Sequence, residues 1–444
     1  MLAHTLTFSP DYDDGFFLQI PAAPAVFLLR GEGEPYVSKT ASLRRRLQRL
    51  LGRPAEQSKQ LNLRERVREV QFTPTGSDFE SQFLLYKLLR KNFAKSYAAR
   101  LRLRPAPLVK LHLENEYPRA SVTTRLGKLV CGQQPSAVRS SEAPDPEDLK
   151  QETVLKSEDS VARLLPPHGH NIYYGPFASR VAAEKFASDA LDFFKMRRCV
   201  DDLHPDPAFP GCVYSEMKMC LAPCYKGCTG NEYRDEVARV QAFFDTGGES
   251  LSRELTEQRE QASSRLAFEE AATIHGKLEK LEHLLSQLAE IVQPISRLRA
   301  IIIQPGAESE EVSLFCFSNG ILRGPASFEV KLSLMSTNTV ENNNGERAVG
   351  PALPKHVSME SRVQEVIQRI SDERSQSTIE STEHLAILKR WYYRTHRIGE
   401  IFFADQRGMW PLRRIVRGIG RVYNGEKPQE STTFSATQPL VPPS

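Results

Sequence analysis

Five of the chain's seven cysteines lie within one stretch of thirty residues, 199–228. Clustered thiols are typical of disulfide frameworks, metal sites or small buried side chains. Four of them are separated by 13, 8 and 4 positions, namely Cys199, Cys212, Cys220 and Cys224. Cysteine thiolates suit zinc and iron–sulfur clusters alike, and spacing alone does not distinguish the two.

The composition indicates a cytoplasmic protein of several domains. A chain of 444 residues is long enough for two to four of them. No stretch approaches the roughly 18–20 apolar residues of a membrane helix, and the N-terminus is acidic where a signal peptide would be basic. Disulfides rarely persist in a reducing cytosol, so metal ligation is the leading interpretation of the cysteine stretch.

The net charge of +4 is unevenly distributed along the chain. Residues 1–130 contain 22 Lys and Arg against 12 Asp and Glu, so the remainder is acidic. A basic N-terminal part is typical of a protein that binds a polyanion, although an ordinary solvated surface has the same composition.

The elements that must position these residues can be read from the N-terminal half. The run "AVFLLR", the turn "GEGEP" and "YVSK" predict two strands over residues 25–39. Leucines at helical spacing then predict a helix that ends at Gly52. A second helix begins near Ser77, which has capping-box spacing to Glu80. "NIYYGPFAS" predicts a turn that leads into a further helix.

The C-terminal half combines helices with a sheet. Residues 236–292 are helical in pattern, and a heptad seam predicts that the last helix pairs with another helix, either of a partner or of the same chain. Asn319-Gly320, between apolar runs, predicts a hairpin, and "GEIFFAD" predicts a strand. The seam residues are Ala271, Ile274, Leu278, Leu281, Leu285, Leu288 and Val292.

The order of these pieces resembles the UvrC family, the nuclease subunit of bacterial nucleotide excision repair. "AVFLLRGEGEPYVSKTASLRRRL" is similar to that family's GIY-YIG motif, and "YYGPF" is similar to a motif that follows its nuclease domain. "FEEAA", from Phe268 to Ala272, is similar to the core of its UVR segment. The cysteine spacing and "CLAPC" are also similar to the family. The resemblance covers roughly residues 25–290.

The resemblance implies an α/β multidomain protein. Its last unit looks like only the opening part of the family's RNase H-like domain, so we expect the second nuclease centre and the helix-hairpin-helix tail to be missing. The predicted segments are an N-terminal extension (1–24), a small GIY-YIG-like α/β domain (25–130), a flexible linker (131–166), a cysteine-rich metal module (167–235), a helical UVR hairpin (236–292), a partial RNase H-like α/β domain (297–425) and a disordered tail (426–444).

The GIY-YIG-like site is predicted to be degenerate. The resemblance places the family's second catalytic tyrosine at Tyr36 and its arginine at Arg46, but its first tyrosine position is Phe27. The glutamate that holds the divalent metal falls at Leu85 or Tyr86, and an expected asparagine falls at Tyr97 or Ala98. Without a carboxylate Mg²⁺ has no ligand here, so its binding is doubtful. The alternative is a relocated ligand, Glu80 or Asp78.

The remaining basic residues are still predicted to contact the DNA backbone, which positions a duplex without reading its sequence. The DNA-binding candidates are Lys39, Arg44, Arg45, Arg49 and Lys91. The resemblance also implies a four-iron, four-sulfur cluster on the four spaced cysteines, with zinc as the alternative and Cys228 in reserve. Lone Cys131 and Cys316 are expected to be ordinary thiols.

The resemblance further implies that the UVR segment binds UvrB. The candidate contacts are Phe268, Ile274, Leu278, Leu281 and Leu285. We therefore expect a UvrC-like repair protein that binds DNA and UvrB and has lost its nuclease chemistry. The alternative is an active excinuclease subunit that cleaves DNA phosphodiesters with a relocated metal ligand.

Overall fold

The computed structural model describes residues 2–53, 61–127, 171–200, 203–331, 358–371, 377–405 and 407–426. The chain forms two compact units, one of Met1–Pro105 with Arg299–Thr432 and the other containing Ala106–Leu298. The predicted linker, the predicted tail beyond Glu426 and Cys131 lie outside the described residues. No described helix has both the length and the apolar character that a membrane crossing requires.

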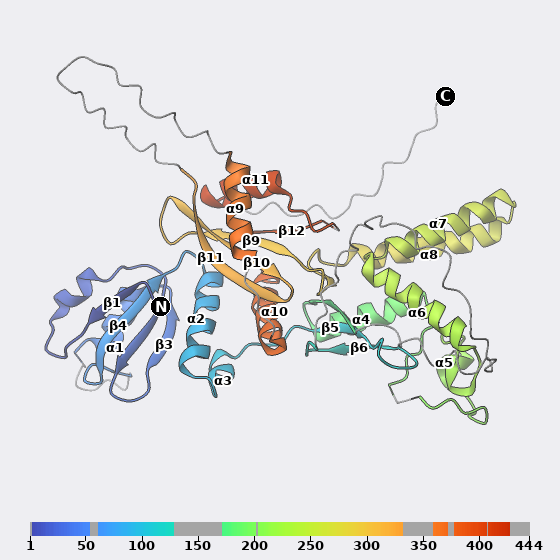
Figure 1. Cartoon of the computed structure of the whole chain (residues 1–444), viewed down its shortest axis with the longest axis horizontal. Coiled ribbons are helices and arrows are strands. Elements are labelled where there is room, and N and C mark those ends of the chain that lie inside the picture. The colour runs from blue at the N-terminus through green and yellow to red at the C-terminus, as the bar shows by residue number, and fades with distance from the viewer. Residues whose placement is uncertain are drawn as a thin grey trace, which may run out of the picture. The chain divides into compact units, whose positions relative to one another are not determined.

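The first unit begins with an antiparallel sheet in the order β1-β4-β2-β3 (Figure 1). The two strands predicted over 25–39 are confirmed as β2 (Ala25–Gly31) and β3 (Tyr36–Thr40). The leucine-patterned helix is confirmed as α1 (Leu43–Leu51), which buries its leucines against this sheet. The other strands are β1 (His4–Thr7) and β4 (Val67–Pro74).

A second antiparallel sheet, in the order β11-β10-β9-β12, belongs to the same unit. The predicted hairpin is confirmed, since Asn319 and Gly320 join β10 to β11 with φ of 53° and 77°. The predicted strand "GEIFFAD" is also confirmed, as β12. The strands are β9 (Ala300–Pro305), β10 (Glu311–Ser318), β11 (Ile321–Glu329) and β12 (Glu400–Phe403).

Helices cover both faces of this second sheet. Successive strand residues point to opposite faces, and Ile301, Ile303 and Leu314 form one core with α9 (Met359–Ser371) and α11 (Leu412–Tyr423). The alternate residue Phe315 points to the other face and meets two phenylalanines of α2 (Asp78–Asn92), Phe79 and Phe83, with ring centroids 5.0 and 6.2 Å away. α10 (Thr378–Tyr392) packs beside α2, as Figure 1 shows.

Helix α2 therefore packs against both halves of the first unit. It contacts β2 and β3 of the first sheet as well as α10. Ser77 caps it by accepting a hydrogen bond from the Glu80 N–H, as predicted. A Cβ on the preceding Gly76 would collide with the carbonyl oxygens of Pro305 and Gly306, so only glycine permits this close approach between the two halves.

The second unit contains a small antiparallel sheet, in the order β6-β5-β7-β8, and five helices among its described residues. The helix predicted after "NIYYGPFAS" is confirmed as α4, but the expected turn is wrong over its first part, because Ile172–Gly175 pairs with β5 as strand β7. The strands are β5 (Leu108–Leu111), β6 (Ala120–Thr123), β7 (Ile172–Gly175) and β8 (Gln293–Pro294). The helices are α4 (Arg180–Leu191), α5 (Val213–Glu216), α6 (Gly230–Asp245), α7 (Glu249–Ser264) and α8 (Phe268–Ser286).

Candidate functional sites

The residues that the resemblance places in the GIY-YIG site, Phe27, Tyr36 and Arg46, lie on the β2–β3 pair and α1. The Arg46 guanidinium donates a hydrogen bond of 2.8 Å to the Tyr36 hydroxyl. The Phe27 ring, fully buried, lies 6.0 Å from the ring of Tyr36. A phenol held by a guanidinium can still position a phosphate, because the arginine supplies charge and the phenol O–H a donor. Phe27 has no hydroxyl and contributes only packing.

The two carboxylates proposed as relocated metal ligands are both held by other groups. Asp78 forms ion pairs of 2.6 Å with Lys39 and with Arg394. Burial raises the pKa of Asp78, but these two cations outweigh it and hold that pKa below its usual value. A carboxylate already neutralised by two cations is a poor ligand for Mg²⁺.

Glu80 is buried where the two halves of the first unit meet. Its carboxylate accepts a hydrogen bond of 3.0 Å from the Gly76 N–H and lies 3.5 Å from the Ser313 hydroxyl of β10. Burial raises the pKa of Glu80 to about 6, against the lowering effect of those two donors, and the Glu311 carboxylate adds to the rise. Neither relocated ligand fits Mg²⁺ at the Tyr36–Arg46 pair.

Substituting Glu80 with glutamine is expected to stabilise the protein above pH 6. The pKa rises from 4.5 to about 6 on folding, so the folded chain binds the proton more tightly and wild-type stability falls as pH increases through that window. Gln keeps an acceptor for the Gly76 N–H and removes the buried charge, which is worth roughly 1–2 kcal/mol at pH 7. Urea unfolding from pH 4 to 8 measures both effects; equal slopes for the two proteins would contradict the assignment.

The helix position expected for the metal glutamate has another role. Tyr86 is buried, and its hydroxyl donates a hydrogen bond of 2.9 Å to the Glu383 carboxylate of α10. The Tyr97 hydroxyl, at the expected asparagine position, donates to the same carboxylate at 2.7 Å. Leu85 is half-buried and Ala98 is exposed. Tyr86 and Tyr97, at the positions where the resemblance places the glutamate and the asparagine, thus form contacts between α2, α3 (Tyr97–Leu101) and α10.

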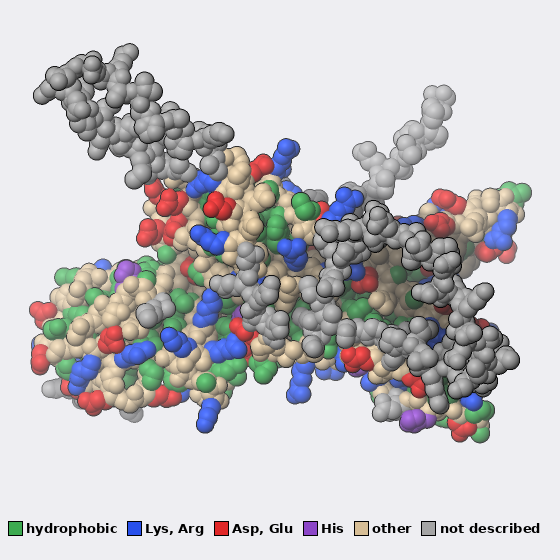
Figure 2. Space-filling view, viewed as in Figure 1, with side chains coloured by type: hydrophobic (Ala, Val, Ile, Leu, Met, Phe, Trp, Pro, Cys, Tyr) green, Lys and Arg blue, Asp and Glu red, His purple; other side chains and the backbone are tan. Residues whose placement is uncertain are grey.

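The candidate DNA-binding residues fall into separate groups. Arg44 donates to the carbonyl oxygens of Ile20 and Leu18, so its guanidinium is engaged by the main chain. Arg45 and Arg49 are exposed on α1, and Lys91 is exposed on α2. Figure 2 shows Lys and Arg side chains gathered over the region of α2. The structure therefore brings Lys91 together with other cations on α2 rather than with those of α1.

The cysteine module is an irregular segment that precedes α6. Cys212 caps the short helix α5, and the stretch around Cys220 and Cys224 turns through left-handed conformations at Ala222 and Lys226. The spaced thiols are all partly buried. Burial raises the pKa of Cys220 to about 11, and the charges of the other three spaced cysteines add to that rise, so those three thiols lie within electrostatic reach of Cys220.

The four spaced cysteines provide the type of ligand, a thiolate, that binds zinc or an iron–sulfur cluster. Two sulfurs already accept N–H donors at 3.3 Å, Cys199 from the Arg197 guanidinium and Cys220 from the Ala222 backbone, and such bonds stabilise ligating thiolates. No group of three or more His, Cys, Asp or Glu within the described ranges is assembled closely enough to hold a metal. The residues thus match a cluster or zinc in chemistry without forming its coordination sphere.

The UVR-like segment is a helical hairpin whose seam is closed within the chain. Helix α8 packs along α7, and its buried residues include Ile274, Leu278 and Leu281. Leu285 is half-buried. At the turn between the helices, in contrast, Leu266 is 71% and Phe268 is 66% exposed. The two open apolar side chains of this hairpin therefore lie at its tip.

Sequence reasoning missed a group of residues that gather around α2 from the C-terminal part of the first unit. Glu383 and His384 of α10, Arg323 of β11 and Arg369 of α9 lie more than 200 positions from α2 in the chain. No spacing or motif signal connects residues so far apart.

Comparison with known proteins points to one family. The family model described as UvrC/Cho excinuclease, middle domain, matches residues 151–243. UvrABC system protein C of Rickettsia rickettsii (strain Sheila Smith) is 30% identical over 167 residues, or 36% of this chain and 26% of that protein. The protein of the same name from Rickettsia canadensis (strain McKiel) is 24% identical over 282 residues, or 63% of this chain and 38% of that protein.

The family-model match lies in the middle of the chain. The chain covers well under two thirds of the length of the curated relatives it matches. No solved structure matches it significantly. The middle-domain match includes the whole cysteine module and most of α6, and it agrees with the curated relatives in name. The middle of the chain is therefore similar to the middle domain of UvrC/Cho excinucleases.

Proposed function

We propose that this chain acts in nucleotide excision repair as a UvrC-type protein that binds the DNA backbone and UvrB and has lost its GIY-YIG nuclease chemistry. The main support for the loss of nuclease activity is the placement of the Asp78 and Glu80 carboxylates. One carboxylate is neutralised by Lys39 and Arg394, and the other is buried against Gly76 and Ser313. Phosphodiester hydrolysis by this type of site needs a metal-held oxygen, and neither carboxylate is free to hold the metal.

DNA binding is supported by what remains at the site. Arg45 and Arg49 are exposed cations beside the Tyr36–Arg46 pair on α1. Such side chains bind phosphates through charge, so affinity should fall steeply with salt. The module would then hold DNA without cutting it.

A nicking assay on damaged duplex with Mg²⁺ or Mn²⁺, with and without UvrB, tests the loss of chemistry. We expect no cleavage above background, together with a salt-dependent gel shift that Arg45→Glu and Arg49→Glu weaken about tenfold. Arg46→Ala is the matched control. Cleavage that disappears in Arg46→Ala would establish an active excinuclease and overturn the proposal; cleavage that survives it would come from a contaminant.

The hairpin tip supports a refined view of UvrB binding. Ile274, Leu278 and Leu281 of the seam are buried and α8 packs along α7, so the exposed apolar side chains left for a partner are Leu266 and Phe268. Apolar anchors at the centre of an interface typically contribute about 2 kcal/mol or more, which is roughly a thirtyfold change in affinity. We therefore place the UvrB contact at the tip and assign the seam to hairpin stability.

Two substitutions separate these roles. Phe268→Asp is expected to abolish capture by immobilised UvrB and to leave the thermal midpoint unchanged, because the side chain is exposed. Leu281→Asp is expected to destabilise the chain by more than the roughly 2–5 kcal/mol of losing a buried leucine, since Leu281 is fully buried. Pull-down and thermal melting are measured on both. Normal capture by Phe268→Asp would refute the tip as the contact.

A further inference from the structure

A cavity of about 820 Å³ lies within the first unit and has no role in the proposed function. Its walls come from α2, β11, α9 and α10. Five cations line it and a single carboxylate, Glu380, opposes them. The cations are Lys87, Arg90, Lys91, Arg323 and Arg369.

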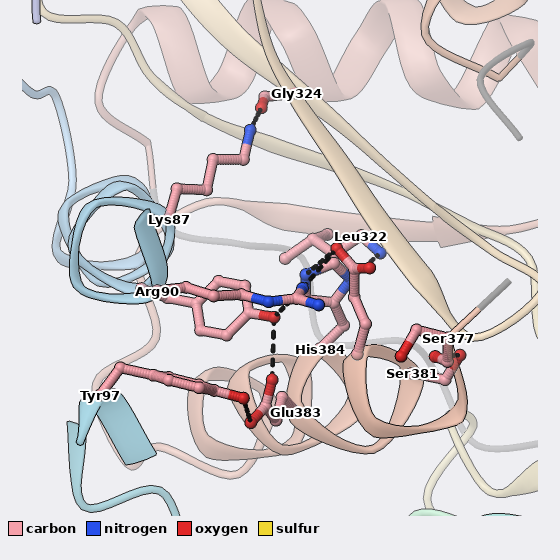
Figure 3. A network of polar contacts seen from close by, with 11 residues as sticks. Lys87, Arg90, Tyr97, Leu322, Gly324, Ser377, Ser381, Glu383 and His384 are labelled. Atoms are coloured by element: carbon pink, nitrogen blue, oxygen red, sulfur yellow. Dashed lines mark hydrogen bonds and ion pairs between the residues drawn. The ribbon is translucent and has the colours of Figure 1, made fainter. Parts of the chain in front are cut away.

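The cations of the cavity are not all engaged within the chain. Arg90 forms an ion pair of 2.9 Å with Glu380, and Lys87 donates to the Gly324 carbonyl at 2.8 Å (Figure 3). Lys91 and Arg369 are exposed, and neither forms an ion pair with any residue in the described part of the chain. Glu380 is already used by Arg90, so the cavity carries an excess of positive charge that an anion would balance.

A buried hydrogen-bond donor also lines the cavity. His384 is 3% exposed, and its Nδ1 accepts a hydrogen bond of 3.1 Å from the Leu322 N–H (Figure 3). Burial lowers the pKa of His384 to about 4, so the ring is neutral at pH 7 and its proton lies on Nε2. Nε2 has no hydrogen-bond partner, and the nearest carboxylate oxygen, on Glu380, is 3.8 Å away. A buried donor of this kind normally has an acceptor.

We propose that this cavity binds the phosphate group of a nucleotide, with Lys91 and Arg369 as its charge partners and the His384 Nε2–H as a buried donor. Phosphate oxygens accept charge-assisted hydrogen bonds from such groups. The volume is that of a site for a whole small molecule rather than for phosphate alone, and apolar walls at Ile321 and Ile370 suit a base or sugar. The inference rests on the cavity and not on the proposed function.

Calorimetric titration of the full chain with 5′-dAMP, and with deoxyadenosine as the control that lacks phosphate, tests the proposal. We expect saturable binding of dAMP and at least tenfold weaker binding of the nucleoside. Arg369→Glu and Lys91→Glu should each weaken dAMP binding at least tenfold. Arg417→Glu, the same charge change at an exposed residue of α11 outside the cavity, should leave it unchanged.

The His384→Asn variant tests whether the buried Nε2–H donor contributes to binding without changing the stability of the protein. The asparagine oxygen can replace Nδ1 as acceptor for the Leu322 N–H, but no donor remains at the Nε2 position. We expect an unchanged thermal midpoint and about fivefold weaker dAMP binding. An affinity for dAMP equal to that of wild type would overturn the role of His384.

Oligonucleotides distinguish the two sources of the phosphate. Tighter binding of 5′-phosphorylated (dT)₆ than of dAMP, lost without the 5′-phosphate, identifies the end of a DNA strand as the ligand. Equal or weaker binding of the oligonucleotide identifies a free nucleotide. Both support the site. No saturable dAMP or oligonucleotide binding, or equal weakening by Arg417→Glu, overturns it.

Discussion

Cys220→Ser and Cys224→Ser are each expected to abolish metal binding by the middle of the chain. Anaerobically purified wild-type protein should contain about four iron and four sulfide per chain with visible absorption, or one zinc if that alternative holds. Serine is a poor ligand for either metal, and the irregular segment around these residues has little apolar core of its own to hold it. The measurements are metal and sulfide content, absorption and protease sensitivity of the segment.

Two other cysteines provide the controls. Cys228 is partly buried just beyond the spaced four, and Cys316 is fully buried in the sheet of the other unit. Cys228→Ser and Cys316→Ala should both retain the metal. Loss of metal in Cys228→Ser would make it a ligand in place of one of the four. A colourless, metal-free wild-type protein that is still folded would remove the cluster altogether.

The sequence was a good guide wherever local chemistry decides the structure. The left-handed turn at Asn319 and Gly320 and the Ser77 cap both depend on interactions within four positions. The Tyr36–Arg46 contact could also be predicted from the sequence, because a strand and the helix that follows it bring these residues together. The expected turn at "NIYYG" failed because its partner strand, β5, is more than 60 positions earlier.

The use of α2 by two sheets was not predictable from motifs. Glu80 looked like a simple capping-box residue, yet its carboxylate binds Gly76 and faces Ser313, 233 positions away. One signal was present. Helix α2 carries more large aromatic side chains than a helix with a single buried face usually has. Phe79, Phe83 and Tyr86 are all buried.

A glutamate at Tyr86, one of the two positions where the resemblance places the metal ligand, is expected to unfold the first unit rather than to produce a nuclease. In Tyr86→Glu, loss of the buried ring costs about 3–5 kcal/mol. The new carboxylate would also lie beside Glu383, which now accepts the Tyr86 hydroxyl at 2.9 Å. Arg90 is paired with Glu380 and offsets only part of that repulsion. Urea unfolding and Mg²⁺-dependent nicking are the two measurements.

Two matched variants show which part of Tyr86 matters. Tyr86→Phe keeps the ring and loses two hydrogen bonds, one to Glu383 and one from Arg90, at about 1 kcal/mol each, while the Tyr97 hydroxyl still donates to Glu383. Leu85→Glu places the same carboxylate on a half-buried position of the same turn and should cost far less than Tyr86→Glu. If Tyr86→Glu unfolded at the wild-type urea concentration and gained nicking, the α2–α10 contact would not be what replaced the metal site. If Tyr86→Glu instead unfolded at a lower urea concentration and showed no nicking, Tyr86 would be a packing residue between α2 and α10 that the fold requires. The absence of a metal carboxylate and the stability of the α2–α10 contact would then have the same structural cause.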